Sequence, residues 1–299
     1  MSVFHEGELA LQRGAGVAER AARLGARGIH DQLLEQQRDF FRELPFLIVG
    51  SIDERGQPTA SLLCGPPGFI ASPDAATLRV NALPAPGDAL AANLRSGAPL
   101  GILGIQPHTR RRNRVNGNVV QSSAPGFSFL VQQSFGNCPK YIQPRELVHT
   151  TLVADQPVSV REGLDERARV LIASADTFFI ASAHPEASSS ALPSRGVDVS
   201  HRGGPAGFLR FSSAFELEMP DFQGNGLFNT LGNVRLQPAV GLLFIDFLTG
   251  DLLSLDAQAE VFVTAPVEAE PETERSVRFT VQRSRFFPAA AAALRELLR

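Results

Sequence analysis

The sequence predicts a mainly β protein, built as two tandem antiparallel barrels with flanking helices and Greek-key-like connections. Its 299 residues are 43% hydrophobic, which is enough apolar content to bury two ordinary cores. The expected strands are short and separated by frequent turn signals, a pattern that favours antiparallel barrels over a parallel sheet. The third observation is an internal repeat, in which residues 93–105 align without gaps on residues 233–245.

The two copies of this repeat keep their apolar residues and differ in their polar ones. Upstream of the aligned segments, Ser61 and residues 65–69 match Ser200 and residues 204–208, at a register one residue shorter. A duplicated frame with diverged charges is typical of one scaffold that carries a divided site. We expect three regions along the chain: an N-terminal helical segment (1–44), a first barrel repeat (45–150) and a second barrel repeat (151–299).

The N-terminal segment is expected to be helical over residues 6–43. Strong helix formers dominate there, and large apolar residues such as Phe40 and Phe41 recur on one face. Glycines interrupt the pattern, and Pro45 ends it. This segment should cover part of a barrel.

Strands of the first copy are expected where β-branched and large apolar residues run between turn signals such as Asp53–Gly56. These runs are 46–52, 60–64, 77–80, 100–105 and 115–120. Residues 88–94 predict a short helix between the third and fourth strands, because Ala and Leu dominate and β-branched residues are absent.

The second copy repeats this order of elements. Helices are expected at 164–174 and 227–231, and strands at 178–181, 197–200, 208–211, 240–247, 252–263 and 276–281. A Ser-, Ala- and Pro-rich stretch over residues 185–194 predicts a longer hairpin insertion. The Ala-, Leu- and Arg-rich residues after the last strand predict a terminal helix.

Composition excludes several classes of function. A net charge of -3 and a pI near 6.1 give no general attraction to nucleic acid or to an anionic membrane. No stretch approaches the roughly 20 apolar residues that span a bilayer, and the first residues are too acidic for a secretory signal. We therefore expect a cytoplasmic protein without nucleic-acid or membrane partners. The 21 phenylalanines should pack mainly in the cores.

The two cysteines, Cys64 and Cys138, lack the spacing of a metal site, so no metal is expected. Separate reduced thiols are the default interpretation. A catalytic role for Cys138 is the less favoured alternative, because unpaired cysteines usually behave as small hydrophobic residues.

An arginine cluster marks the first copy and is missing from the second. Residues 110, 111, 112 and 114 are all arginine, whereas the matching stretch of the second copy includes Thr249-Gly250-Asp251. On a strand, Arg112 and Arg114 point the same way and Arg111 points to the other face. Two guanidinium groups on one face suit a phosphate. The alternative is a solvated strand edge that blocks aggregation; an RNA-binding patch is disfavoured because aromatic residues are not interleaved.

The second copy carries a polar strand end where the first is apolar. Ser200-His201-Arg202-Gly203-Gly204 stands in place of Ser61-Leu62-Leu63-Cys64-Gly65. Glycine-backed amides, a hydroxyl and a guanidinium group can approach an anion closely. Residues 221–230 then open a short helix, whose amino end also favours negative charge, although Asn225 and Asn229 are equally typical of turns and caps.

After the first copy, Lys140 stands beside Tyr141, the one tyrosine of the chain. The preceding Pro139 and a Gly-Asn turn should hold this pair in place, so that it offers a fixed cation and an aromatic ring with a polar tip. A solvated loop lysine is the alternative.

Three stretches, Phe4–Glu8 near the start, Arg110–Gly117 and Ser134–Gln143, together resemble the pyridoxamine 5′-phosphate oxidase-like family of flavin-nucleotide-binding split barrels. Residues 196–208 with 221–229 are similar to the same family's other common pattern. The resemblance runs from Phe4 to about residue 263. It implies six-stranded split barrels that bind FMN at the interface between two barrels, with arginine, lysine and serine on the phosphate. By position it implies these cofactor-binding residues: Arg112, Arg114, Lys140, Ser200, His201, Arg202, Gly203, Asn225 and Asn229.

The function that the resemblance implies is an FMN-dependent oxidoreductase whose substrate and catalytic residues are not assigned. Its partners would be a small-molecule redox substrate or nicotinamide donor and a ferredoxin-reductase-type electron partner, with two chains forming a homodimer. Two alternatives stay open. One is a flavin-binding or flavin-storage module without turnover, and the other is a split barrel without flavin that handles haem or binds other proteins.

Overall fold

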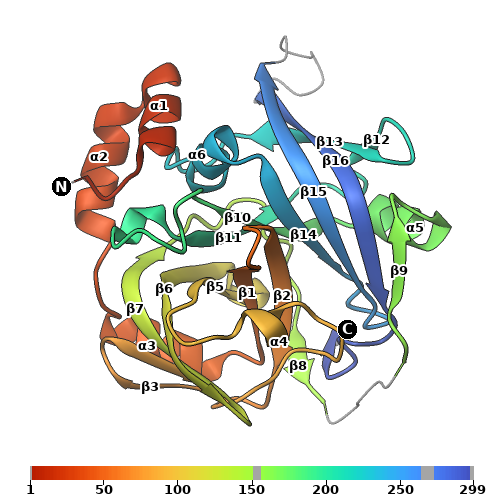
Figure 1. The fold of residues 1–299 in the computed structure, drawn as a ribbon, viewed down its shortest axis with the longest axis horizontal. Helices are drawn as coiled ribbons and strands as arrows, with labels where there is room; N and C mark the ends of the chain where they lie inside the picture. Colours follow the sequence, from red (N-terminus) through yellow and green to blue (C-terminus); the bar gives the residue numbers. More distant parts are fainter. Residues whose placement is uncertain (1, 151–155, 264–272, 297–299) are drawn as a thin grey trace.

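The computed structural model describes residues 2–150, 156–263 and 273–296 (Figure 1). The first half comprises α1 (Glu6–Gly14), α2 (Ala18–Gly28), α3 (Glu35–Glu43), β1 (Phe46–Ile52), β2 (Pro58–Cys64), β3 (Ile70–Asp74), β4 (Thr77–Val80), α4 (Leu90–Asn93), β5 (Pro99–Gln106), η1 (Pro107–Thr109), β6 (Arg111–Ser123) and β7 (Gly126–Gly136). The second half comprises β8 (Leu147–His149), β9 (Ser159–Glu162), α5 (Glu166–Ser174), β10 (Thr177–Ala183), η2 (Pro193–Arg195), β11 (Val197–Gly203), β12 (Arg210–Phe211), β13 (Glu216–Phe222), α6 (Asn229–Leu236), β14 (Ala239–Ile245), β15 (Leu252–Val263), β16 (Thr273–Phe287) and β17 (Leu294–Glu296).

The strands form two antiparallel sheets with the same order. The first runs β2-β1-β5-β6-β7-β4-β3, and the second runs β11-β10-β14-β15-β16-β13-β12, with β9 beside β16. Each of the seven strands of the first sheet therefore has a counterpart in the second, whereas β9 has none among the strands described for the first. The predicted fold class, mainly β with two tandem antiparallel barrels, is confirmed.

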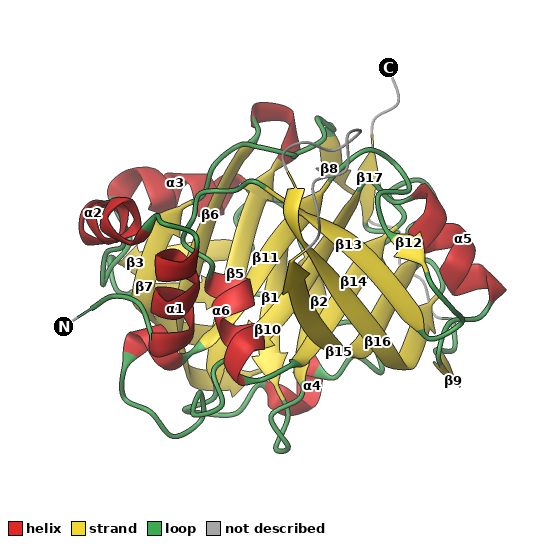
Figure 2. Cartoon of the chain, turned by 90° about the horizontal axis from the view of Figure 1, so that it is seen from above, coloured by secondary structure: helices red, strands yellow, loops and turns green. Residues whose placement is uncertain are grey.

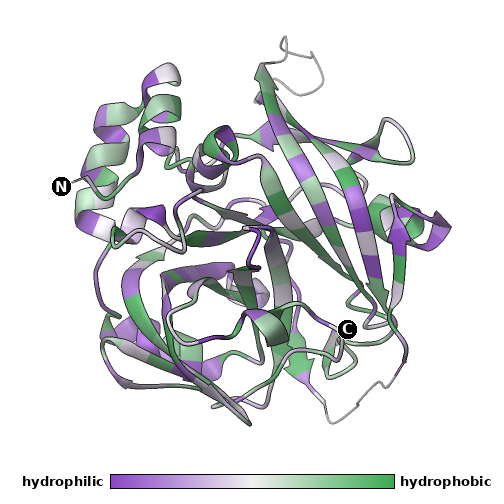
Figure 3. Cartoon of the chain, viewed as in Figure 1, coloured by the Kyte–Doolittle hydropathy of each residue, from purple (hydrophilic) through white to green (hydrophobic). Residues whose placement is uncertain are grey.

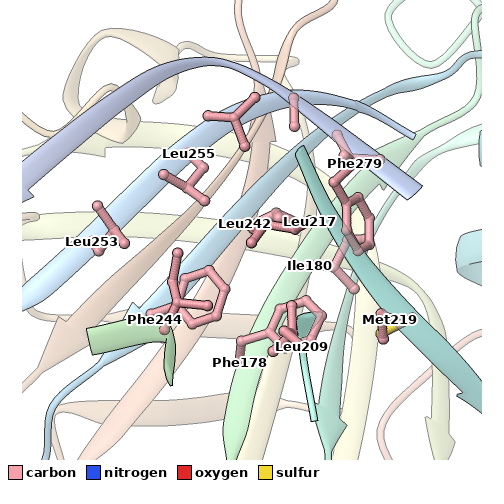
Figure 4. Packing of buried hydrophobic residues seen from close by; sticks show 14 of the residues in the cluster. Phe178, Ile180, Leu209, Leu217, Met219, Leu242, Phe244, Leu253, Leu255 and Phe279 are labelled. Carbon is pink, nitrogen blue, oxygen red and sulfur yellow. The ribbon is translucent and has the colours of Figure 1, made fainter. Parts of the chain in front are cut away.

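Each sheet curls around its own apolar core. In the first, residues from β1 to β7 meet Phe40, Phe41 and Leu44 from α3 and the residue after it, so this helix closes the barrel. In the second, the Phe178 ring lies 5.2 Å from Phe244 and 6.3 Å from Phe279, centroid to centroid (Figure 4). The long strands β15 and β16 alternate hydrophobic and hydrophilic residues, as half-buried strands do (Figure 3).

The two barrels pack against each other through β1, β2 and β5 on one side and β10, β11 and β14 on the other. Apolar side chains such as Ile48, Leu103, Phe179 and Leu243 form this third cluster. Matching glycines allow the backbones to approach: a Cβ on Gly101 would lie 2.6 Å from a carbonyl oxygen of β11, and one on Gly241 would lie 2.5 Å from a carbonyl oxygen of β2. The repeat thus carries glycine at both places for the same steric reason.

The N-terminal helices serve both halves. While α3 closes the first barrel, α1 lies against α6 of the second, as Figure 2 shows. The contact is close because glycines meet: a Cβ on Gly7 would lie 2.2 Å from the Gly232 carbonyl oxygen. Among the described helices, none is long and apolar enough to cross a membrane.

The expected terminal helix is wrong over the residues that the structure describes. β16 continues to Phe287, turns follow, and residues 294–296 pair with β8 as β17. Ala291 and Leu294 are buried in the cluster between the barrels, so long-range packing overrides the helix propensity of alanine. Sequence analysis also leaves out β3, β7 and β13, whose runs are short or interrupted by polar residues.

Candidate functional site

One cavity of about 370 Å³ lies between the two halves, and every predicted binding residue lines it. From the first half come Arg112, Arg114 and Lys140, and from the second come Ser200, His201, Arg202, Gly203, Asn225 and Asn229. Their role as ligands of a cofactor stays a prediction. Their meeting at one place is a feature of the fold, because β6 and β11 approach each other across the interface between the barrels.

Arg112 and Arg114 reach the cavity because both lie on one face of β6. They pair across the sheet with Ile105 and Leu103 of β5, whereas Arg111 points away and lies over the Phe40 ring, 5.2 Å from its centroid. The alternation predicted from the sequence is confirmed. The arginine cluster is thus divided between a surface and a buried wall.

Arg114 is almost fully buried and is held by β11. Its Nη1 donates to Asp198 Oδ1 at 2.9 Å and its Nη2 to Ser200 Oγ, while its Nε has no partner. Asn116 Nδ2 donates to the same Asp198 oxygen at 2.8 Å. This ion pair joins the two halves directly behind the cavity.

Arg112 is held by a neutral histidine. Its Nε donates to the Cys138 carbonyl oxygen and its Nη1 to His201 Nδ1, both at 2.9 Å. Burial, together with the charges of Arg112 and Arg202, lowers the pKa of His201 well below its ordinary value. His201 therefore accepts this hydrogen bond as a neutral ring, and its contribution is to position Arg112.

Arg202 and Arg275 share one buried carboxylate. Asp221 accepts from Arg202 Nη1 at 3.5 Å and from Arg275 Nε at 3.2 Å, and the Nε of Arg202 has no partner. Burial lowers the pKa of Arg202 and also that of Arg112, and the charge of Arg114 lowers both further. Crowded guanidinium groups with spare donors form a site that an anion would stabilise.

Asn225 and Asn229 form hydrogen bonds within the protein and also line the cavity. Asn225 Oδ1 accepts from the Leu227 backbone at 3.1 Å, and its Nδ2 donates to Asn137 Oδ1 at 3.4 Å. Asn229 Nδ2 donates to Glu8 of α1. The turn interpretation of Asn225 is therefore correct for its side-chain oxygen, and both residues also form part of the cavity wall.

Lys140 and Tyr141 lie at the rim. Tyr141 has a left-handed backbone with φ of 64°, its hydroxyl contacts the Gln223 carbonyl oxygen at 3.1 Å, and its ring stacks on Phe222 at 5.2 Å. Gly203 makes room for this turn, since a Cβ there would lie 2.1 Å from the backbone carbonyl oxygen of Tyr141. Lys140 is exposed, and its Nζ lies 3.5 Å from the Gln223 carbonyl oxygen.

Sequence analysis misses several parts of the site. The predicted site leaves out Asp198, which fixes Arg114, and Arg275, which shares Asp221. It also leaves out Arg20 of α2. Asp198 and Asp221 stand in the stretches that carry the family resemblance, so a search for carboxylates beside the predicted arginines would find them. Arg20 has no signal in the sequence, because the position of α2 depends on long-range packing.

A second polar cluster, outside the cavity, has the composition of a metal site. His5, Glu6 and His184 hold ligand atoms within 4.8 Å of one another. In both rings Nδ1 accepts a backbone N–H, from Gly7 at 3.1 Å and from Glu186 at 3.0 Å. The ring proton of each is therefore on Nε2, which cannot ligate a metal while it is protonated. His184 Nε2 lies 3.2 Å from Glu6 Oε1, whereas His5 Nε2 has no hydrogen-bond partner among the described residues.

Among solved structures, the chain resembles single barrels that each span less than half of it. HupZ from Group A Streptococcus is 14% identical, with a TM-score of 0.31 over 43% of this chain and 97% of its own. A protein of the pyridoxinephosphate oxidase family from Clostridium acetobutylicum is 10% identical, with a TM-score of 0.28 over 42% of this chain and 87% of its own. A FAD-binding protein from Mesorhizobium loti is 10% identical, with a TM-score of 0.29 over 44% of this chain and 99% of its own.

No family model and no curated protein matches the sequence. Some of the solved structures that resemble the chain are described as pyridoxamine or pyridoxine phosphate oxidase proteins, the kind of protein that the sequence motifs resemble. At this level of identity and TM-score, the likeness carries no information about function.

Proposed function

We propose that this chain binds FMN in the cavity between its barrels and works as an FMN-dependent oxidoreductase of the pyridoxamine 5′-phosphate oxidase-like kind. The supporting observation is that three buried or half-buried arginines from both halves, Arg112, Arg114 and Arg202, meet at one cavity. Guanidinium groups in such positions favour a phosphate, which accepts charge-assisted hydrogen bonds from several donors.

The residues present fit this cofactor. The buried cavity-lining atoms without a partner are Arg114 Nε, Arg202 Nε and Asn137 Nδ2 among the residues described, and all three are donors. Spare donors without spare acceptors suit an anion. The stacked rings of Tyr141 and Phe222 line the same cavity and offer flat apolar surface for a planar ring system.

When bound, FMN supplies hydride transfer, and the protein supplies position and electrostatics. Arg112, Arg202 and Ser200 would hold the phosphate, with His201 keeping Arg112 in place. A small-molecule redox substrate or nicotinamide donor would enter past the exposed Lys140. Since His201 is neutral and already bonded to Arg112, no side chain is assigned to proton transfer.

The haem alternative fits this cavity less well. His201 is the sole histidine among the described residues that line it, and its Nδ1 is engaged by Arg112. A flavin-storage module would use the same contacts as the enzyme, so only reactivity separates those two. The ferredoxin-reductase-type partner and the homodimer stay predictions, and within one chain both walls of the cavity are already supplied.

The test is a titration of the purified chain with FMN, followed by anaerobic addition of NADH or NADPH. We expect a complex with the flavin absorbance near roughly 450 nm, and bleaching of that band by the nicotinamide donor. Absence of FMN binding would refute the proposal. Binding without reduction by any hydride donor would favour the storage module.

A further inference from the structure

We propose that the mouth of the cavity is a second anion subsite, in which Arg20 and Lys140 bind the phosphate or carboxylate of the substrate that meets the cofactor. The inference rests on the proposed function and adds the substrate class, an anionic hydride donor such as a nicotinamide dinucleotide. The two cations come from elements far apart in the sequence, α2 and the segment after β7, and line the same cavity.

Arg20 is carried on an anchored helix. Its neighbour Ala21 is 1% exposed and packs with Phe4 and with Leu227, which lies two residues before α6. Val17, at the start of the same helix, lines the cavity and faces Gly226. The backbone of α2 is therefore fixed beside the opening, although the Arg20 side chain itself is exposed.

Lys140 is also carried on a fixed turn. The carbonyl of the next residue, Tyr141, packs directly on Gly203, and the Tyr141 ring stacks on Phe222. Among the residues that the structure describes, neither Lys140 nor Arg20 forms an ion pair; the closest polar contact of Lys140 is the Gln223 carbonyl oxygen at 3.5 Å. Two unneutralised cations thus lie at the rim of the cavity.

These rim charges differ from the buried ones in what they can reach. The inner wall already offers the spare donors of Arg114, Arg202 and Asn137 for a phosphate. Lys140 and Arg20 are exposed, on the solvent side of that wall, so they act on a molecule that arrives at the opening. In a chain with a net charge of -3, a local positive rim steers anions toward one place.

The first experiment measures binding rather than turnover. Inorganic pyrophosphate is titrated calorimetrically into FMN-loaded wild-type protein, into the Arg20→Ala/Lys140→Ala double variant and into an Arg13→Ala/Arg27→Ala control. The control removes the same charge from exposed positions of α1 and α2 that do not line the cavity. We expect roughly tenfold weaker pyrophosphate binding in the rim variant, the scale of two exposed ion pairs, and no change in the control.

The second experiment compares two hydride donors in anaerobic reduction of the same proteins. NADPH carries phosphates, whereas 1-benzyl-1,4-dihydronicotinamide is neutral. The rim variant should lose affinity for NADPH alone, and added salt should weaken wild-type binding of NADPH toward that of the variant. An equal loss for both donors, or no pyrophosphate binding by the wild-type protein, would overturn the inference.

FMN affinity, measured first for each protein, separates the two proposals. If the wild-type chain binds no FMN, the proposed function fails. If FMN binds the wild-type chain but is lost from the rim variant, Arg20 and Lys140 belong to the cofactor site and the second subsite is refuted. Unchanged FMN affinity with weakened pyrophosphate binding supports it.

Discussion

The two halves of the chain place different residues at matching positions of the same fold. Ile105 of β5 pairs with Arg112, while Ile245, its counterpart in β14, pairs with Leu252. On the neighbouring strands, His201 and Arg202 of β11 stand where β2 has Leu62 and Leu63. These positions define two matching places in the fold. The place around Arg112 is a polar cavity, whereas the place around Leu252 is filled by the apolar cluster between the barrels, which includes Leu62 and Leu252.

The segments that close the two places differ in the same way. After β7 the chain contributes Asn137, Cys138 and Lys140 to the cavity, whereas the end of β16 and the turn after it contribute Phe287 and Ala291 to the apolar cluster. The two halves thus share one frame, and the polar cavity lies at only one of these two matching places. We therefore expect one FMN per chain.

Each place also contains an ion pair, buried for Arg114 and half-buried for Arg285. Arg114 of the first half bonds Asp198 of the second, whereas Arg285 bonds Asp256 within its own sheet through two contacts of 2.7 and 2.9 Å. Neither residue of the pair within the sheet lines the cavity. The pair across the interface holds a guanidinium group at the cavity wall.

The largest expected effect follows from breaking the pair across the interface. Arg114→Ala leaves Asp198 buried without its cation, and should lower the free energy of unfolding by about 3–5 kcal/mol. Urea unfolding of the FMN-free chain measures this. The double variant Arg114→Met/Asp198→Asn should recover much of the loss, and Ser254→Ala, at the matching position of β15, should cost far less. Equal losses in Arg114→Ala and Ser254→Ala would contradict the comparison.

Each place has a carboxyl group nearby whose pKa is shifted by burial, so the pH dependence of stability also tests the comparison. Burial, assisted by the charge of Asp198, raises the pKa of Glu8 from 4.5 to about 8, and burial raises the pKa of Asp88 in the other place. Between these values the folded chain holds a proton on Glu8 that the unfolded chain has lost. The contribution of Glu8 to stability is therefore greatest below pH 4.5 and falls as the pH rises to 8.

Glu8→Gln should remove this dependence, because the amide stays neutral. The wild-type chain should lose about 2–4 kcal/mol more than the variant on going from pH 5 to pH 8, the scale set by about 1.4 kcal/mol per pKa unit. His5 acts in the opposite sense, since burial lowers its pKa from 6.5 to about 4 and stability then rises with pH over that interval. Because His5 titrates in both proteins, the difference between their two profiles reports Glu8, and parallel profiles between pH 6.5 and 8 would refute the assignment.

The sequence predicts the parts of the site that depend on local rules. The period of a strand places Arg112 and Arg114 together, and the repeat places Ser200 to Gly203 at a strand end that matches Ser61 to Cys64. The pairing of Arg114 with Asp198, and the approach of Arg20, depend on how the halves and the N-terminal helices dock. The terminal strand β17 is missed for the same reason, because it depends on pairing with β8, which is far away in the sequence.

A smaller effect is expected on FMN binding when one cavity cation is removed. Arg202→Ala or Arg112→Ala should weaken FMN binding by about 1.5–3 kcal/mol, the scale of a hydrogen bond to a charged group. Arg111→Ala is the matched control, since that arginine lies on the same strand and faces away. Fluorescence titration measures the three affinities. Wild-type affinity in both cavity variants would retire them as phosphate ligands.

The two cysteines mark the two places and allow the mildest test. Cys138 lines the cavity, where its Sγ lies 3.5 Å from Arg112 Nη2, whereas Cys64 ends β2 at the position that Gly203 occupies in β11. Burial raises the pKa of the Cys64 thiol to about 12, so its reactive thiolate is scarce at neutral pH.

Iodoacetamide should therefore label Cys138 first, and bound FMN should slow that labelling severalfold without affecting Cys64. Peptide mass spectrometry, with Cys138→Ser to confirm the site, measures both rates. Faster labelling of Cys64, or labelling of Cys138 that ignores FMN, would show that the cavity near Arg112 is not where the ligand binds.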